Sequence, residues 1–272
     1  MRRESMAGPP GVRWIPGQHS GAGVLVLAGS RGLADESRAR LLAEQGALAE
    51  SIQWFGGPGQ NPGPWEIAVE TFQARVARLA ADCDRVILIG LSFGAEAALL
   101  TAAQTPQVSA VVAFSPSDVV WAGVAPDGRQ TSHWTLAGAP VPFVPLAADW
   151  QPGSDPPSYR SLYLRSRELS PAAVGAATIA VERIPDVVLV AGGDDQVWPA
   201  GLHAGLIARR RARHQLPTTV ITEEAAGHRA VLPGEPVVTA GMRMQRGGTD
   251  AANRRLGGRA WDAILGLLAG PP

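Results

Sequence analysis

A Gly-x-Ser-x-Gly pentapeptide, Gly90-Leu91-Ser92-Phe93-Gly94, lies between two segments that predict different secondary structures. Residues 86–89 form an apolar run typical of a buried strand, and the alanine-rich residues 95–103 are typical of a helix. This context describes a nucleophile elbow, a strained strand-to-helix turn whose glycines let the two elements approach closely. Because the chain contains 32 glycines, the pentapeptide alone is a weak signal. The other parts of a serine-centred site must come from the rest of the chain.

Short apolar runs alternate with helical segments, a pattern that predicts a mostly parallel sheet with helices on both faces. The expected strands are 24–27, 48–55, 86–89, 108–114, 187–190 and 218–222, and the expected helices are 34–47, 66–81, 95–103, 201–214 and 261–268. Residues 56–64 are too rich in Gly and Pro for either element, and the Gly- and Arg-rich residues 243–255 are expected to be mobile. We therefore expect an α/β fold of the α/β-hydrolase type, with residues 1–272 as one domain whose core covers about 24–114 and 185–269.

The alternation lapses between residues 115 and 184, where Pro and Gly are frequent and aromatic residues are scattered. A long irregular segment inside a compact domain is usually functional or disordered, and its aromatic residues argue against disorder. We expect a cap insertion over the mouth of a pocket, with a helix at residues 170–181. Trp121, Trp134 and Phe143 are candidates for the lining of a substrate pocket, although they could equally anchor the cap to the core.

Composition excludes several classes of function. The chain has 24 acidic and 24 basic residues and a formal net charge of zero, so no polyanionic partner such as nucleic acid is indicated. All basic residues are Arg, which excludes a P-loop, a Lys nucleophile and a Schiff base. Cys83 is the only cysteine, which excludes an intrachain disulfide and a cysteine-based zinc site. The sequence predicts no cofactor and no metal.

No apolar run approaches the roughly 18 residues of a membrane span. The two arginines near the N-terminus are not followed by the apolar segment of a signal peptide. We therefore expect a soluble cytoplasmic protein.

A serine hydroxyl near neutral pH needs an adjacent base, and that base needs a carboxylate that orients it. Asp195 follows the predicted strand 187–190 in a Gly-x-x-Asp-x-x-x-Pro pattern, and His228 lies in a Gly-His loop after the next strand. The order Ser92, Asp195, His228 is typical of α/β-hydrolases. All three residues follow strands, so we expect them to meet at the carboxyl edge of the sheet as nucleophile, acid and base.

Each member of this predicted triad except Ser92 has competitors of its own type. Asp194 competes with Asp195, although an Asp in such a loop also serves to bind the loop backbone. The histidines that compete with His228 are His19 before the sheet, His133 in the cap, and His203 and His214 on a predicted helix with polar neighbours. Their positions favour His228 as the base.

An oxyanion hole would use the backbone N–H of Phe93 and a second N–H from the turn Gly29-Ser30-Arg31-Gly32. Ser30 is the first choice for this donor and Arg31 the alternative, and Arg31 is also a candidate for the substrate pocket. The arginine-rich residues 209–213 could bind the phosphates of a coenzyme A thioester, but a solvated helix face explains them more simply.

Together these residues resemble the C-terminal catalytic domain shared by acyl-coenzyme A thioesterases and bile acid-coenzyme A:amino acid N-acyltransferase. The resemblance extends from about residue 24 to residue 268. It is carried by Gly29-Ser30-Arg31-Gly32, Trp54-Phe55-Gly56, residues 90–96, Phe114-Ser115-Pro116-Ser117, Val120-Trp121, Ser132-His133-Trp134-Thr135 and Pro140-Val141-Pro142-Phe143. The most specific parts are Val181-Glu182-Arg183-Ile184 and residues 192–199.

The resemblance implies acyl transfer from a thioester, linked to coenzyme A or to a carrier protein, through a covalent acyl-enzyme. Ser92, Asp195 and His228 match the family's nucleophile, acid and base. The animal members carry an immunoglobulin-like domain ahead of the catalytic one, and the first 23 residues here are too few to form it. The amino acid transferase uses a Cys nucleophile, so Ser92 resembles the hydrolytic members and favours water as the acceptor.

The sequence thus predicts a serine hydrolase that takes an acyl group from a thioester or from an activated ester. Transfer of the acyl group to an amine or alcohol, including cyclisation, is the nearest alternative. A carboxylesterase and a non-catalytic acyl-binding protein are further alternatives. The length of the acyl group, its carrier and the oligomeric state stay open.

Overall fold

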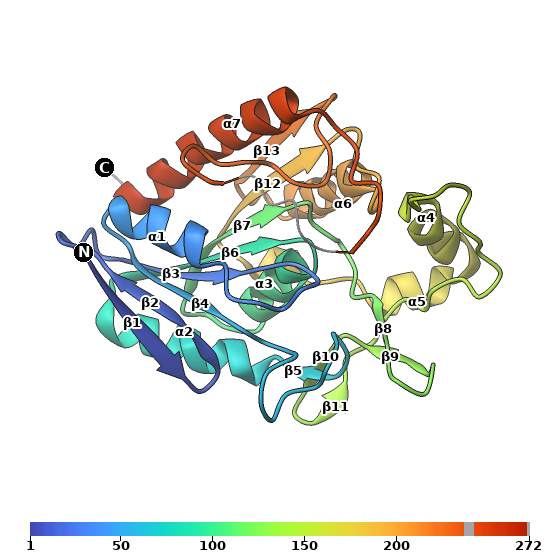
Figure 1. The fold of residues 1–272 in the computed structure, drawn as a ribbon, viewed down its shortest axis with the longest axis horizontal. Helices are drawn as coiled ribbons and strands as arrows, with labels where there is room; N and C mark the ends of the chain where they lie inside the picture. Colours follow the sequence, from blue (N-terminus) through green and yellow to red (C-terminus); the bar gives the residue numbers. More distant parts are fainter. Residues whose placement is uncertain (237–241, 271–272) are drawn as a thin grey trace.

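The structure is a computed structural model that describes residues 1–236 and 242–270. Its centre is an eight-stranded sheet (Figure 1). Across the sheet the strands are β1 (Arg2–Ala7), β2 (Pro10–Ile15), β4 (Leu48–Ile52), β3 (Ala22–Leu27), β6 (Arg85–Leu91), β7 (Val108–Phe114), β12 (Asp186–Gly192) and β13 (Thr218–Glu223). From β4 to β13 all neighbours are parallel, while β2 is antiparallel to β1 and to β4. The predicted α/β fold with a mostly parallel sheet is confirmed.

Helices cover both faces of this sheet (Figure 1). Helices α1 (Glu36–Glu44) and α7 (Asp250–Ala269) lie on one face, and α2 (Glu70–Asp82), α3 (Phe93–Ala103) and α6 (Ala200–Arg213) lie on the other. Along β6, Leu88 packs with α2 and α3, whereas Ile87 and Ile89 pack on the side of α1 and α7. Parallel strands that are buried on both faces are apolar throughout, so their positions could be predicted from the apolar runs of the sequence.

The cap insertion at residues 115–184 has more regular structure than the sequence predicted. It contains the short strands β8 (Ala122–Val124), β9 (Gln130–Ser132), β10 (Trp134–Leu136) and β11 (Ala139–Pro140), the helices α4 (Arg160–Leu169) and α5 (Pro171–Ala176), and the 3₁₀-helix η1 (Val181–Arg183). Strand β5 (Ile67–Ala68), which lies within the range predicted for a helix at 66–81, pairs with β10.

The helix predicted at residues 170–181 is only partly correct. Its N-terminal half forms α5, but Thr178 pairs with Val119 in an isolated β-bridge, and this pairing takes the chain out of the helical path. The longer helix α4 was not predicted from the sequence.

Two further expectations differ from the structure. The N-terminal hairpin of β1 and β2 was not predicted, because Val12 is its only buried residue and an edge hairpin lacks a continuous apolar run. The Gly- and Arg-rich residues 243–255, for which no regular element was expected, include the first residues of a helix. Helix α7 begins at Asp250 after the cap residue Thr249, and a Cβ on Gly248 would lie 2.0 Å from the Gly227 nitrogen. The glycines here permit close packing of two loops.

Within the described residues, no helix has the length and apolar character needed to cross a membrane.

Two adjacent glycines of α7 give a matched test of how closely this helix packs against the loop that contains Val231. A Cβ on Gly257 would lie 1.9 Å from the carbonyl oxygen of Val231, whereas no atom lies within 4 Å of a Cβ on Gly258. Gly257→Ala should therefore lower the free energy of unfolding by about 1–3 kcal/mol through overpacking. Gly258→Ala should raise it by about 0.5–1 kcal/mol, because Ala is the better helix former. Urea denaturation of the two variants measures both, and equal effects would contradict the predicted contact.

Candidate active site

Ser92 occupies the turn between β6 and α3 in a conformation that only close packing can hold. Its φ of 58° and ψ of −123° are unusual for a residue with a side chain, and such strain costs about 1–3 kcal/mol. A Cβ on Gly90 would lie 2.1 Å from the Gly94 oxygen, and a Cβ on Gly94 would lie 2.3 Å from the Leu27 oxygen. Both flanking glycines are therefore required, as a nucleophile elbow demands.

Asp195 and His228 form a hydrogen-bonded pair beside this turn. Asp195, in the loop after β12, is fully buried, and its Oδ2 accepts a hydrogen bond of 2.8 Å from Nδ1 of His228. Its Oδ1 accepts from the backbone N–H of Val197 at 2.8 Å and of Trp198 at 3.2 Å. These bonds fix the carboxylate and the imidazole plane, and they leave Nε2 as the ring nitrogen that can exchange a proton. His228 lines the same cavity as Ser92.

Asp194, the competitor of Asp195, binds the loop instead of an imidazole. Its Oδ2 accepts from the Gly248 N–H and its Oδ1 from the Gln196 side chain, both at 2.7 Å. These two hydrogen bonds, that of Gly248 first, lower the pKa of Asp194 below its usual range. The structure thus gives Asp194 the role of binding loop groups that the sequence left open for it.

The other four histidines lie away from the cavity that Ser92 and His228 share. His19 accepts from the Gly21 N–H, His133 bonds Glu96, His203 bonds Asp118, and His214 ends α6. The His203–Asp118 pair is buried, but neither residue is among those that line the cavity with Ser92. Among the described residues, only His228 combines a carboxylate partner with a place beside Ser92.

The backbone of His228 is held by residues that the sequence did not identify. The Ser115 hydroxyl donates to the His228 carbonyl oxygen at 2.7 Å, and the His228 N–H donates to the Arg246 carbonyl oxygen at 2.8 Å. The Trp198 indole in turn donates to the Ser115 carbonyl oxygen at 3.1 Å. Ser115 follows directly on β7, and its place at a strand end and in the segment Phe114-Ser115-Pro116-Ser117 are the signals that could have marked it.

The two residues predicted to form an oxyanion hole border the space beside Ser92. Phe93 is the first residue of α3, so its N–H has no acceptor within the helix, and the helix N-terminus favours negative charge. Ser30 lines the cavity in the turn after β3. A Cβ on Gly29 would lie 3.3 Å from the Leu91 oxygen, so this turn lies against the elbow. The predicted donors Phe93 and Ser30 are therefore brought together.

The cavity has a volume of about 520 Å³ and a mostly apolar wall. Its larger apolar and aromatic lining residues are Leu33, Leu91, Phe93, Leu146, Tyr159, Leu162, Tyr163, Val197, Trp198, Met242 and Met244. Leu146 and three residues at the start of α4, Tyr159, Leu162 and Tyr163, belong to the insertion, so the insertion forms part of the cavity wall. Met244 lies in the range 243–255 that was expected to be mobile, and Met242 lies directly before it.

The cap is joined to the loop that carries Asp195. The Arg160 guanidinium donates to the carbonyl oxygens of Gly193 at 3.2 Å and Asp195 at 3.1 Å. The backbone N–H groups of Tyr159 and Arg160 both donate to the Gln196 carbonyl oxygen. The first turn of α4 and the loop of Asp195 therefore form one connected unit.

The aromatic residues proposed for the pocket have a different place. Trp121 and Trp134 are fully buried in the core, and Phe143 packs against the same core. The Trp134 indole donates to Oε1 of Glu96 at 2.7 Å, which joins the cap to α3. None of the three lines the cavity with Ser92, so they anchor the cap instead. Arg31 does line it.

The arginine-rich residues 209–213 also lie outside this cavity. Arg211 is buried and donates to the carbonyl oxygens of Val181 and Ile184, each at 2.6 Å. Arg210 pairs with Glu182, and this hydrogen bond lowers the pKa of Glu182 to about 2. Arg210 and Arg211, two of the four arginines in this segment, therefore hold η1 against α6.

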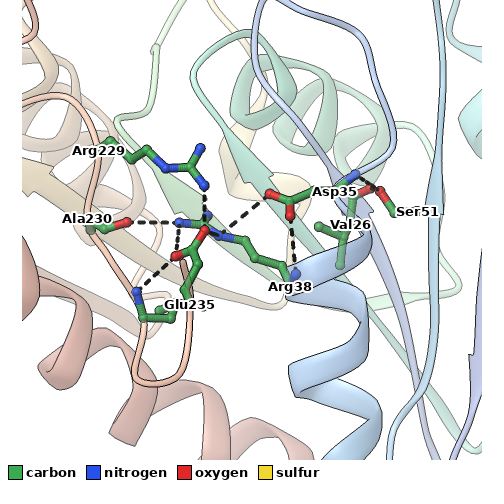
Figure 2. A network of polar contacts seen from close by, with 8 residues as sticks. Val26, Asp35, Arg38, Ser51, Arg229, Ala230 and Glu235 are labelled. Carbon is green, nitrogen blue, oxygen red and sulfur yellow. Dashed lines mark hydrogen bonds and ion pairs between the residues drawn. The ribbon is translucent and has the colours of Figure 1, made fainter. Parts of the chain in front are cut away.

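A buried ionic network joins α1 to the loop that follows His228 (Figure 2). Arg38 on α1 is 1% exposed, and its Nε and Nη2 donate to the Glu235 carboxylate at 3.0 and 3.2 Å. Nη2 also donates to the Ala230 carbonyl oxygen at 2.9 Å, and the guanidinium lies 4.6 Å from the Phe114 ring centroid. This side chain thus holds the His228 loop against the helix.

The network continues in both directions (Figure 2). Arg229, the residue after His228, donates to the same Glu235 carboxylate. On the other side, Asp35 caps α1 and its N–H donates to the Ser51 hydroxyl, which donates to the Val26 carbonyl oxygen, each at 2.8 Å. The network therefore connects the chain after Ser30 with the chain after His228.

The parallel sheet, the elbow at Ser92 and the Asp195–His228 pair define the class of α/β-hydrolases. The family model described as "Alpha/beta hydrolase family" matches residues 16–241, and the chain belongs to this family. Among curated proteins, none matches this sequence.

Solved structures show the same fold at low sequence identity. A puromycin-hydrolysing peptidase of Mycobacterium tuberculosis is similar over all of this chain and 39% of its own, with 17% identity and a TM-score of 0.59. A putative dienelactone hydrolase of Klebsiella pneumoniae is similar over 99% of this chain and 98% of its own, with 12% identity and a TM-score of 0.55.

The ionic network makes a prediction about stability and pH. Burial tends to raise the pKa of Glu235, but the charges of Arg38 and Arg229 outweigh burial and hold it below its usual range. A group with a lower pKa in the folded state contributes stability above its unfolded pKa of about 4.3, and this stability is lost as pH falls through the folded pKa. Glu235→Gln should cost about 3–5 kcal/mol at pH 7, because it leaves Arg38 buried without a carboxylate.

The difference between wild type and Glu235→Gln should shrink as pH falls below about 4.3, where the carboxyl of the unfolded chain becomes protonated, and should vanish below the lower pKa of the folded protein. Urea denaturation at a series of pH values measures it. Glu44→Gln, which removes an exposed partner of Arg40, is the control and should change stability little at any pH. A difference for Glu235→Gln that stayed constant down to pH 3 would contradict the ionic role.

Proposed function

We propose that this chain is a serine hydrolase that cleaves acyl thioesters through an acyl-serine intermediate, as acyl-coenzyme A thioesterases do. Ser92 is the nucleophile, His228 the general base and Asp195 the carboxylate that orients the imidazole. One observation carries the proposal: the hydrogen-bonded pair of Asp195 and His228 borders the cavity into which the strained turn brings Ser92.

In the first half of the reaction the Ser92 hydroxyl attacks the thioester carbonyl while Nε2 of His228 takes its proton. The negative oxygen of the tetrahedral intermediate accepts hydrogen bonds from the N–H groups of Phe93 and Ser30. The intermediate collapses by breaking the carbon–sulfur bond. The proton on His228 passes to the departing sulfur, and the thiol leaves.

In the second half, water attacks the acyl-serine and His228 takes its proton. A second tetrahedral intermediate forms at the same oxyanion donors and expels Ser92, which recovers its proton from His228. The product is the free acid. Bonds from Val197 and Trp198 to Asp195 keep the carboxylate in place while the imidazole is charged.

Support for an acyl thioester as the substrate comes from two sides. The sequence pattern around Ser92, Asp195 and the segment 181–184 resembles acyl-coenzyme A thioesterases, and a Ser nucleophile corresponds to the members that use water. The apolar wall of the cavity, with a volume of about 520 Å³, suits an acyl group of moderate size.

The triad makes the next prediction. Asp195→Asn should lower kcat for thioester hydrolysis by about 10⁴-fold, because the amide favours the wrong tautomer of His228. Asp194→Asn is the matched control and should keep most of the activity, since an amide oxygen still accepts from Gly248. Ser92→Ala should abolish the acyl-enzyme. Thiol release with a thiol-reactive dye gives the rates.

Intact-protein mass spectrometry with a panel of acyl thioesters and aryl esters detects the acyl-enzyme directly. A mass increment on wild type that is absent from Ser92→Ala supports the proposal, and product analysis with added amines and alcohols separates hydrolysis from acyl transfer. Full thioesterase activity in Ser92→Ala, or no labelling of wild type by a fluorophosphonate, would exclude Ser92 as the nucleophile.

A further inference from the structure

Arg31 is the exposed cation of the cavity that holds Ser92. It follows Ser30 in the turn after β3 and lines the cavity. Across residues 1–236 and 242–270, its guanidinium has no ion pair and no hydrogen bond. A guanidinium offers five donors in a planar fork that matches a carboxylate or a phosphate. An uncommitted one beside the reacting serine is therefore a candidate for binding an anionic part of a substrate.

The acidic residues of the lining cannot neutralise Arg31, because each is already paired with another arginine. Glu36 accepts two hydrogen bonds from Arg3, at 2.6 and 3.1 Å. Asp35 caps α1 and lies 3.8 Å from Arg38. The positive charge of Arg31 is thus left over in a cavity whose two carboxylates are committed elsewhere.

The ionic cluster next to Arg31 is balanced in charge. Arg229 is paired with Glu235, and Arg38 with both Glu235 and Asp35, so two arginines face two carboxylates there. The chain as a whole has a formal net charge of zero, so the uncommitted charge of Arg31 is a local property of the site. Apolar walls weaken the screening of such a charge by water.

We infer that the substrate carries an anionic oxygen group that Arg31 binds, so the site selects charged acyl thioesters over neutral ones. This inference rests on the proposed function and names its substrate class. Because Arg31 is adjacent to Ser30, the anion would lie close to the reacting carbonyl, either on the acyl group or on the thiol. A carboxylate is the natural anion on an acyl group, and a phosphate or sulfonate represents one on the thiol.

Three thioesters, one neutral and two anionic, distinguish an anion on the acyl group from an anion on the thiol. The hexanoyl thioester of N-acetylcysteamine is neutral. The mono-thioester of hexanedioic acid with the same thiol adds a carboxylate to an acyl chain of equal length. The hexanoyl thioester of 2-mercaptoethanesulfonate places the anion on the leaving group. For each variant, the quantity measured is kcat/KM for a charged substrate divided by kcat/KM for the neutral one.

Arg31→Gln should lower this ratio by about 10-fold or more for one charged substrate, since a charge-assisted bidentate contact is lost. Arg31→Lys should keep part of it. The ratio of the wild type should also fall as salt is added, because the contact is ionic. The substrate whose ratio falls identifies the side that carries the anion.

Arg78→Gln is the control. Arg78 is exposed on α2 and has no place in the lining of the cavity, so its substitution should leave both ratios unchanged. Ratios in Arg31→Gln equal to those of wild type for both charged substrates would overturn the inference while leaving thioester hydrolysis intact. If wild type hydrolyses none of the three and Ser92 is not acylated, the proposed function fails and the inference with it.

Discussion

The strained turn at Ser92 depends on contact between backbone atoms that no side chain could replace. The turn is held because Gly94 lies against the carbonyl oxygen of Leu27 at the end of β3, and because Gly29 lies against that of Leu91. The strain at Ser92 and the position of Ser30 therefore have the same cause. Strands β3 and β6 are neighbours in the sheet, and the turns that carry Ser30 and Ser92 follow their ends. Both turns therefore border the same cavity.

The opposite wall of the site is built by different means. The loops that carry Asp195 and His228 are joined by hydrogen bonds to Ser115 and Arg246, and the buried pair of Arg38 and Glu235 ties the second loop to α1. Buried ion pairs contribute little net stability, because the loss of hydration offsets their attraction. Their value here is geometric: removing one partner leaves a buried charge, so the loop has few alternative positions.

Much of the fold, and the place of the candidate site residues at the ends of strands, could be predicted from the sequence, for physical reasons that also explain the failures. Strands such as β7 are buried on both faces and read as apolar runs, and Ser92, Asp195 and His228 follow such strands. The hairpin at β1, helix α4 and the close glycines 247 and 248 depend on tertiary contacts that leave no periodic pattern. Trp121 and Trp134 are ambiguous in the sequence because large aromatic residues serve cores and pockets alike. Their full burial, and the bonds of their indole N–H groups to Ser117 and Glu96, decide between the two roles.

The connection between Arg160 and the loop of Asp195 bears on how such a protein can diversify. A cap inserted between two strands is usually thought of as a module that evolution can exchange freely while the core stays constant. Here the first turn of the cap helix binds the carbonyl oxygen of Asp195 and that of Gln196. A chimera that imported a cap from a relative would have to bring residues 158–160 and 193–196 as one inherited block. Selectivity for new substrates is therefore expected to arise more readily by change within α4 and Leu146 than by replacement of the whole insertion.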